Sequence, residues 1–386
     1  MRRVRGALTM GRCRRGEALA SRPCSTRLLT VCLVGAAWVA AAGCGSRVAP
    51  PAPPKESPPA RLSEYGFFRG KPADHVPVDG VVPYDLNTPL FSDYTEKYRF
   101  VRLPKGTQAA YHPTDEFAFP VGTILVKTFA YPRDMRDPAK GRRLLETRLL
   151  VHEPKGWVGL PYVWNDEQTD ATLEIAGGFL DASWIDQDGE TRTNNYIIPN
   201  VNQCKGCHKV RNKVMTPIGP KARHLNRDFA YAHGKENQLA YWSRAGLLRG
   251  APASDAAPRL AAWDDEQSGT LDERARAWLE INCAHCHNPE GPARNSALDL
   301  LASQNEPVKF GVWKAPVAAG LGSGNLRYSI VPGKPDESIL AYRIASTHPS
   351  VMMPELGKRL VHEEGVALVR DWIASLKDPT GAAATP

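Results

Sequence analysis

The sequence TLDERARAWLEINCAHCH, residues 270–287, predicts a helix that leads directly into a pentapeptide rich in cysteine and histidine. Thr270 and Glu273 have the spacing of a capping box, in which each side chain accepts a hydrogen bond from the other residue's backbone N–H. Farther along, residues 363–376 repeat valine, isoleucine and leucine at helical intervals. Helices are therefore expected on both sides of the pentapeptide, and residues 269–380 are expected to form an all-α domain.

The pentapeptide Cys283-Ala-His-Cys-His287 has a second copy, Cys204-Lys-Gly-Cys-His208. Two thiols separated by two residues can reach the two vinyl groups of one porphyrin, and the histidine that follows can face the iron. We therefore expect two covalently bound c-type haems (haem c). Their thioether residues would be Cys204, Cys207, Cys283 and Cys286, and their proximal iron ligands would be His208 and His287.

Paired cysteines also occur in redox dithiols and in zinc sites, and two such pairs could form one four-thiolate zinc centre. Neither alternative requires a histidine after each pair, whereas c-type haem attachment does. The haem interpretation is therefore favoured over both alternatives.

A β-rich segment is predicted from about Leu62 to Asn200, where apolar runs with the composition of strands are interrupted by glycine and proline. Asp188-Gly189 marks a hairpin turn, and Pro199 is expected to end the last strand just before the first pentapeptide. The pattern indicates an antiparallel, sandwich-like domain whose tryptophans belong to the core. The predicted strand regions are residues 123–131, 144–152, 157–164 and 182–198, and the tryptophans are Trp157, Trp164 and Trp184.

Composition divides the chain into successive parts, so the expected fold class is a multidomain α+β protein. Residues 44–61 are rich in proline and suit an extended tether, and residues 236–268 combine a short amphipathic helix with a linker. The expected parts are a signal peptide (1–43), the tether (44–61), a β-rich domain with the first pentapeptide (62–235), the helix and linker (236–268), and the all-α domain with the second pentapeptide (269–380).

The N-terminus has the pattern of a secretory signal. Residues 1–27 carry eight arginines and one acidic residue, and an apolar run over residues 28–43 ends in small residues. Ala41-Ala-Gly-Cys44 resembles a bacterial lipoprotein box, which would lipidate Cys44 and anchor the protein to a membrane. Cleavage after the preceding alanines would instead leave a soluble protein; we favour the lipoprotein because Cys44 has no other evident partner. Either route predicts a periplasmic protein.

The basic charge of the chain belongs largely to this signal. The whole sequence has 49 basic and 41 acidic residues, a net charge of +8. Removing residues 1–43 leaves 41 basic and 40 acidic residues, a net charge of +1. A nearly neutral surface does not favour nucleic acid as a partner.

The order of a helix, CxxCH, a Met-Pro pair and a closing amphipathic helix resembles the class I cytochrome c family, over about a third of the chain. The resemblance implies thioethers at Cys283 and Cys286, His287 as proximal ligand and Met353 as distal ligand. Met352 competes for the distal role, but proline after the ligand is usual in that family because it stiffens the loop. A thioether ligand raises the reduction potential compared with two imidazoles. The remaining histidines of this region, His285, His348 and His362, are expected to have no special role, and His285 is expected at the surface.

The whole mature chain resembles a bacterial family of predicted dihaem c-type cytochromes. The stretches that carry the resemblance are residues 119–127, 146–150, 203–208 and 217–221. The resemblance implies a periplasmic electron carrier with redox proteins as partners. Similar regions accompany secreted quinoprotein sugar dehydrogenases, so a periplasmic dehydrogenase is the expected electron donor.

The distal ligand of the first haem stays open, because no sequence motif identifies it. Met215, His224 and His233 follow the first pentapeptide, and the β-rich domain adds His112, His152 and Met135 as candidates. An iron without a sixth ligand could bind peroxide or oxygen. The expected function is therefore electron transfer without catalytic residues, and the alternative is a dihaem peroxidase or oxidase with an open first haem. A residual option is that the β-rich domain binds a saccharide or another protein.

Overall fold

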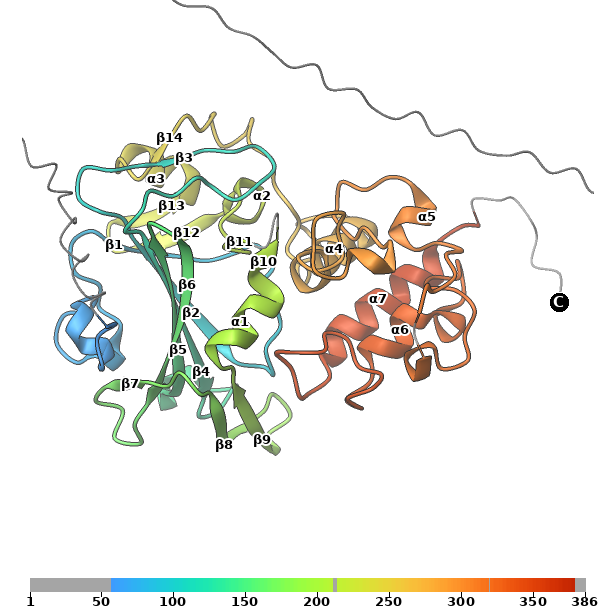
Figure 1. Cartoon of the computed structure of the whole chain (residues 1–386), viewed down its shortest axis with the longest axis horizontal. Coiled ribbons are helices and arrows are strands. Elements are labelled where there is room, and N and C mark those ends of the chain that lie inside the picture. The colour runs from blue at the N-terminus through green and yellow to red at the C-terminus, as the bar shows by residue number, and fades with distance from the viewer. Residues whose placement is uncertain (1–56, 211–213, 319, 379–386) are drawn as a thin grey trace, which may run out of the picture. The chain divides into compact units, whose positions relative to one another are not determined.

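The computed structural model of the chain describes residues 57–210, 214–318 and 320–378 (Figure 1). The expected signal peptide, the lipidation candidate Cys44 and most of the proline-rich tether lie outside these residues. Within the described ranges, no helix combines the length and the apolar character that crossing a membrane requires. The fold is mixed α+β, with an antiparallel sheet in the N-terminal half and short helices later in the chain.

A six-stranded antiparallel sheet forms the centre of the N-terminal half, in the order β1-β2-β4-β5-β6-β7. The strands expected within residues 123–131, 144–152 and 157–164 are confirmed as β4, β5 and β6. Sheet neighbours are close in sequence, as antiparallel pairing through short connections allows. The strands are β1 (Val81–Tyr84), β2 (Glu96–Arg102), β4 (Ile124–Pro132), β5 (Arg142–Glu153), β6 (Gly156–Trp164) and β7 (Ala171–Leu173).

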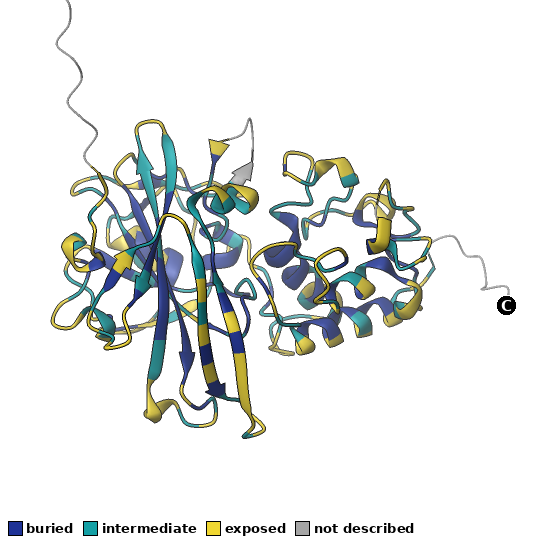
Figure 2. Ribbon diagram, turned by 60° about the horizontal axis from the view of Figure 1, so that its bottom comes forward, coloured by how far each residue is buried: buried dark blue, intermediate teal, exposed yellow. Residues whose placement is uncertain are grey.

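The central strands of this sheet are buried over much of their length (Figure 2), and their buried side chains belong to different clusters on the two faces. On β4, Ile124 and Val126 pack in one cluster with Leu62, which precedes the sheet. Leu125 belongs to a different cluster that includes Trp242, from a helix far along the chain. Because successive residues of a strand point to opposite faces, β4 reads as a nearly continuous apolar run rather than as an alternating one.

The hairpin expected around Asp188-Gly189 is confirmed. It consists of β8 (Gly178–Ile185) and β9 (Thr191–Ile198), and Gly189 has a φ of +87° in the turn between them. Trp184 of β8 stacks on Tyr131 of β4 at 4.1 Å between ring centroids, so the hairpin packs against the sheet. Pro199 directly follows the last paired residue, as predicted.

The expected core tryptophans have different degrees of burial. Trp164 and Trp184 are buried, which confirms their assignment to the core. Trp157 is half-buried, packs at the edge of a core cluster and stacks on His152 at 4.5 Å between ring centroids.

Several short helices and two-stranded pairs, formed mostly by residues 209–249, accompany the six-stranded sheet. The helix expected at the start of residues 236–268 is α3 (Gln238–Arg244), capped by the side chain of Asn237. Leu239 and Trp242 of α3 are buried in the same cluster as Leu125 of the sheet. The other elements are a parallel pair, β3 (Ala109–Ala110) with β14 (Leu248–Arg249), two antiparallel pairs, β10 (Lys209–Val210) with β11 (Val214–Met215) and β12 (Asp228–Tyr231) with β13 (Gly234–Asn237), and the helix α2 (Ala222–Leu225).

The C-terminal part of the chain contains a few short helices separated by turns and irregular segments, and the predicted capping box is confirmed. The backbone N–H of Thr270 donates to Glu273 Oε2 at 2.8 Å, and the N–H of Glu273 donates to Thr270 Oγ1 at 3.3 Å. The helices are α4 (Leu271–Leu279), which continues into a π-helical turn (Glu280–Ala284), α5 (Pro307–Phe310), α6 (Ile339–Ile344) and α7 (Glu363–Ser375). Single 3₁₀ turns lie at Leu62–Tyr65, Pro72–Asp74, Pro138–Lys140, Arg294–Ser296, Gly320–Ser323 and Pro335–Glu337.

Helices α4 and α7 pack closely at a glycine. A Cβ on Gly365 of α7 would lie 2.5 Å from Trp278 Nε1 and 2.5 Å from His362 Nδ1. These two atoms are hydrogen-bonded at 3.0 Å, with Trp278 as donor. The missing side chain at position 365 therefore lets both rings approach the helix.

A buried ion-pair network joins α2 to the π-helical turn. Glu280 contacts Arg223 and accepts a hydrogen bond from His224 Nε2 at 3.2 Å and from the backbone of Ala302 at 2.9 Å. Burial by itself raises the pKa of Glu280, but the hydrogen bond and charge of His224 and the charge of Arg223 outweigh it and lower this pKa to about 2. Glu280 is therefore an ionised carboxylate in the folded protein.

Candidate functional site

The first CxxCH motif lies on α1 (Val201–His208), directly after the last strand of the hairpin. Asn200 and Gln203 cap its start reciprocally, each side chain accepting the other's backbone N–H at 2.8 and 2.9 Å. Cys204 packs against β6 at Gly159, where a Cβ would lie 3.1 Å from its sulfur. A glycine in the middle of a strand here gives the thiol room against the sheet.

The imidazole of His208 is held in one tautomer. Its Nδ1 lies 2.8 Å from the carbonyl oxygen of Thr216, which can only accept, so Nδ1 carries the proton and Nε2 keeps its lone pair. Burial lowers the pKa of His208 to about 4, so the ring is neutral near pH 7. A neutral imidazole oriented through Nδ1 is the form that binds a metal through Nε2.

His287, in the second motif, shows the same arrangement with a side-chain acceptor. Its Nδ1 lies 2.9 Å from Ser296 Oγ, and that hydroxyl donates its own proton to the carbonyl of Ala293 at 2.7 Å. Ser296 must therefore accept from Nδ1, which again leaves Nε2 free. Burial lowers the pKa of His287 to about 4.

Two cavities adjoin the two motifs. The first is lined by Cys204, Cys207 and His208, and the second by Cys283, Cys286 and His287. The motifs themselves are neighbours, because Cys286 Sγ lies 4.0 Å from the carbonyl oxygen of Gly206. A hydrogen bond from Cys286 also lowers the pKa of the Cys207 thiol. The cavities share part of their lining, which includes Cys207, His285 and Met353.

Both neighbouring methionines line the first cavity, and one of them also lines the second. Met353, the expected distal ligand of the second haem, lines the second cavity together with His287 and also reaches the first. Met352 lines the first cavity only, together with His208. Met353 is therefore the one of the two that adjoins both CxxCH motifs.

The six candidates for the distal position of the first haem are not among the described residues that line the first cavity. His224 binds Glu280, His233 binds Glu236, and His112 accepts the backbone N–H of Asp115. His152 contacts the carbonyl of Pro120, Met215 is buried beside Gly159, and Met135 packs under the β8–β9 hairpin.

Two histidines without an expected role line the first cavity instead. His285 is half-buried rather than exposed at the surface, and its Nδ1 is buried without a hydrogen-bond partner in the described chain. His362 accepts the Trp278 N–H at Nδ1 and stacks on Phe91 at 4.3 Å between ring centroids. Burial lowers the pKa of His362 to about 4, so the neutral ring carries its proton on Nε2. That tautomer is not the one that ligates a metal through Nε2.

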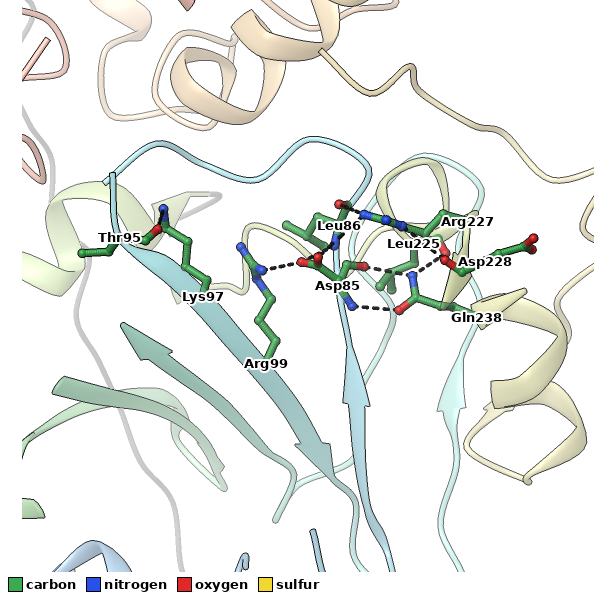
Figure 3. Close-up of polar contacts among 9 residues, drawn as sticks. All are labelled: Asp85, Leu86, Thr95, Lys97, Arg99, Leu225, Arg227, Asp228 and Gln238. Carbon is green, nitrogen blue, oxygen red and sulfur yellow. Dashed lines mark hydrogen bonds and ion pairs between the residues drawn. The ribbon is translucent and has the colours of Figure 1, made fainter. Parts of the chain in front are cut away.

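Cationic side chains form one wall of the first cavity. Arg99, Lys127 and Arg148 line it from β2, β4 and β5. Figure 3 shows Arg99 beside Lys97 on β2, with its guanidinium directed at the carboxylate of Asp85. The sequence of each strand indicates which side chains share a face of the sheet. It does not indicate that the cations of three strands lie opposite one another, because that depends on strand register.

The residues of both cavities fit a c-type haem. Each cavity is lined by the two cysteines of one motif, by the motif histidine with its free Nε2 and by apolar walls that suit the face of a porphyrin. Apolar residues of the walls include Leu125, Leu150 and Leu160 in the first cavity and Leu298, Leu300 and Ile339 in the second. Among the residues that the structure describes, no three His, Cys, Asp or Glu side chains are grouped to hold one metal ion, so the four-thiolate arrangement is not seen. Comparisons of the chain with protein-family models, with curated proteins and with solved structures found no match.

Proposed function

We propose that the protein is a periplasmic dihaem c-type cytochrome that transfers electrons, with a periplasmic dehydrogenase as donor. The observation that carries the proposal is the state of the two motif histidines. His208 and His287 each commit Nδ1 to an oxygen acceptor and keep Nε2 free beside two thiols. Two unrelated elements, α1 and the turn after α4, have this arrangement, and it is the one that a proximal haem ligand needs.

The proposal includes the finer architecture expected from the sequence. The six-stranded sheet and the β8–β9 hairpin would be a sandwich-like domain that carries the first haem. Helices α4 and α7, which pack at Gly365, would correspond to the first and last helices of a class I cytochrome c. A lipid on Cys44 would anchor the protein to the membrane, and its partners would be redox proteins rather than nucleic acid.

We assign the iron ligands from the two cavities. His287 and Met353 would bind the second iron, and His208 and Met352 would bind the first, because Met352 lines the cavity of His208. A bound haem supplies one-electron chemistry at its iron. The protein's part is to fix the imidazole tautomers, to supply soft thioethers that favour ferrous iron, and to surround both sites with apolar side chains.

The contact between the motifs supports electron exchange between the two sites. Cys286 lies beside Gly206 of the first motif, and Cys207 lines both cavities. Groups attached at Cys207 and Cys286 would therefore be close neighbours. A single protein could then accept an electron at one site and release it from the other.

The alternative is a dihaem peroxidase or oxidase, and His285 is the observation that favours it. His285 lines the first cavity and has a buried Nδ1 without a partner in the described chain, so an acid–base group there could act on a bound oxidant. Carbon monoxide addition to the reduced protein separates the two functions. Rapid binding at the first haem would favour the peroxidase, and no binding would favour the electron carrier.

Covalent haem content tests the main proposal. The mature chain, expressed with a c-type maturation system, should have a mass that includes two haems after extraction with acid and organic solvent, because thioethers survive denaturation. Cys207→Ser should lower the mass of the protein by one haem through selective loss at the first motif. Cys286→Ser should do the same at the second motif. A protein that binds zinc, or that carries no covalent haem at either motif, would refute the proposal.

A further inference from the structure

Three cationic side chains lie next to one another on neighbouring strands, on one face of the sheet. In the strand register, Arg99 of β2 is the partner of Lys127 of β4, and Lys127 is the partner of Arg148 of β5. Residues directly opposite in neighbouring antiparallel strands share a face and have adjacent side chains. All three line the first cavity, so we call them the cation row.

The row lies within an otherwise apolar face. On one side of it are Leu125 and Leu150, which pack with the α3 cluster. On the other side is Phe129, which packs with the β8–β9 hairpin. Cations placed directly opposite one another repel, and burial strengthens the effect. A sheet that served stability alone would have apolar residues at these positions.

Nearby carboxylates pair with only some of the hydrogen-bond donors of the two arginines in the row. Arg99 is 5% exposed and binds Asp85 at 2.5 Å, but its Nη2 is buried without a partner in the described chain. Arg148 pairs with Glu146, and its Nε is likewise buried without a partner.

Lys127 is the least satisfied member of the row. Its ammonium lies 4.7 Å from the centroid of Phe129, and no carboxylate within the described residues forms an ion pair with it. Burial, together with the charges of Arg99, Lys97 and Arg148, lowers the pKa of Lys127 well below its usual value, and the more distant Glu146 only partly offsets them. An anion in the cavity would reverse each of these effects, because it would pair with the ammonium and with both unpartnered guanidinium nitrogens.

The row begins near the first CxxCH motif and extends away from it. Cys204 packs against Gly159 of β6, and β5 with Arg148 is the next strand. From β6 to Arg99 on β2 there are three strand spacings, about 14 Å at about 4.8 Å each. A haem joined through its vinyl groups carries its two propionate carboxylates on the edge opposite those groups. A haem attached at Cys204 and Cys207 that extends along this face of the sheet would bring that edge toward the far end of the row.

We propose that Arg99 and Lys127, supported by Arg148, form a carboxylate-binding site that receives the propionates of the haem attached at Cys204 and Cys207. This inference rests on the proposed function. Arginine suits the role because its planar fork binds a carboxylate through two parallel hydrogen bonds. The same chemistry would also bind a free carboxylate that enters the cavity, and the experiment separates the two sources.

The test is a redox titration of the haem-loaded protein with Lys127→Met. Mass spectrometry first counts the haems. An unmodified protein without a haem at the first motif would refute the proposed function, and the role of the cation row is tested only in protein that carries both haems. In a variant with both haems, we expect the ferric form of the first haem to be favoured about tenfold, or about 59 mV for a one-electron couple. The potential of the second haem should not change.

The pH dependence of the first potential distinguishes propionate binding from a general charge effect. Burial and the charge of Arg99 lower the pKa of Lys97, which lies beside Arg99 on β2, to about 7, so the profile is compared at mildly acid pH, below that titration. Paired propionates stay ionised there, and the first potential of the unmodified protein should be flat. In Lys127→Met a propionate should titrate in this range and give the potential a slope. Lys127→Arg should stay flat, and Lys105→Met, which removes an exposed lysine from a turn, is the charge-matched control. If Lys127→Met fails to take up haem, Arg99→Gln is titrated in the same way.

Two results would overturn the inference. One is a two-haem Lys127→Met protein whose first potential and pH profile match those of the unmodified protein. The other is a change in the first-haem spectrum when succinate is added to the unmodified protein but not to Lys127→Met, which would assign the row to a free carboxylate. Insensitivity to succinate together with the new pH slope would establish the propionate role.

Discussion

Replacing Gly365 with alanine tests the packing between α4 and α7 that places Trp278 and His362 in the first cavity. In a helix, alanine is more favourable than glycine by up to about 1 kcal/mol. Here the added Cβ would lie 2.5 Å from Trp278 Nε1 and 2.5 Å from His362 Nδ1. The rings come from different elements and are hydrogen-bonded to each other, so neither can move without breaking that bond.

The opposing effects can be compared. Overpacking costs about 1–3 kcal/mol, and loss of the Trp278–His362 hydrogen bond costs about 1 kcal/mol. After subtraction of the helix-propensity gain, Gly365→Ala should lower the free energy of unfolding by about 1–3 kcal/mol. Urea unfolding of the haem-loaded chain, followed by circular dichroism, should show a lower midpoint at an unchanged slope.

The matched control is Ala367→Gly, two residues along the same helix and exposed to solvent. It reverses the substitution without changing the packing, so it should cost up to about 1 kcal/mol through propensity alone. If Gly365→Ala is as stable as the unmodified protein or more stable, the close approach of the two rings does not constrain the helix and the reasoning fails.

Three further predictions concern the candidate sites and their support. Met353→Ala should abolish the sulfur-to-iron absorption band of the second haem, and Met352→Ala that of the first; loss of both bands from one variant would contradict the assignment to separate haems. Gly159→Ala should lower covalent loading at the Cys204 site severalfold, because its Cβ would lie 3.1 Å from the sulfur, whereas Gly178→Ala, with no atom within 4 Å, should load normally. Because the pKa of Glu280 is lowered in the folded protein, its carboxylate contributes to the free energy of unfolding fully above the ordinary pKa of glutamate. This contribution is lost as the pH falls through about 2. Its loss should cost on the order of 3 kcal/mol, and Glu280→Gln should remove this part of the acid dependence in unfolding titrations.

Local patterns in the sequence were sufficient to predict the regular elements. Strands β4, β5 and β6, the Asp188-Gly189 hairpin, the Thr270 capping box and helix α7 all depend on interactions between residues close in the chain. The helix expected at the start of residues 236–268 is short in the structure, because residues 234–237 form β13 and Gly246, with a φ of +72°, follows its last turn. Glycine in this left-handed conformation commonly ends a helix, and Leu248 then pairs with Ala109 in a parallel bridge that no local pattern indicates.

The sequence by itself determined the chemistry of the candidate sites, because the spacing of Cys204, Cys207 and His208, and of their counterparts at 283–287, is a local covalent requirement. Only the tertiary structure decided what surrounds these residues. The placement of Met352 and Met353 beside the cavities, the partial burial of His285 and the alignment of Arg99, Lys127 and Arg148 bring together residues from distant segments. Strand alternation indicates which residues share a face, but strand register, which comes from packing of the whole core, determines which residues lie side by side.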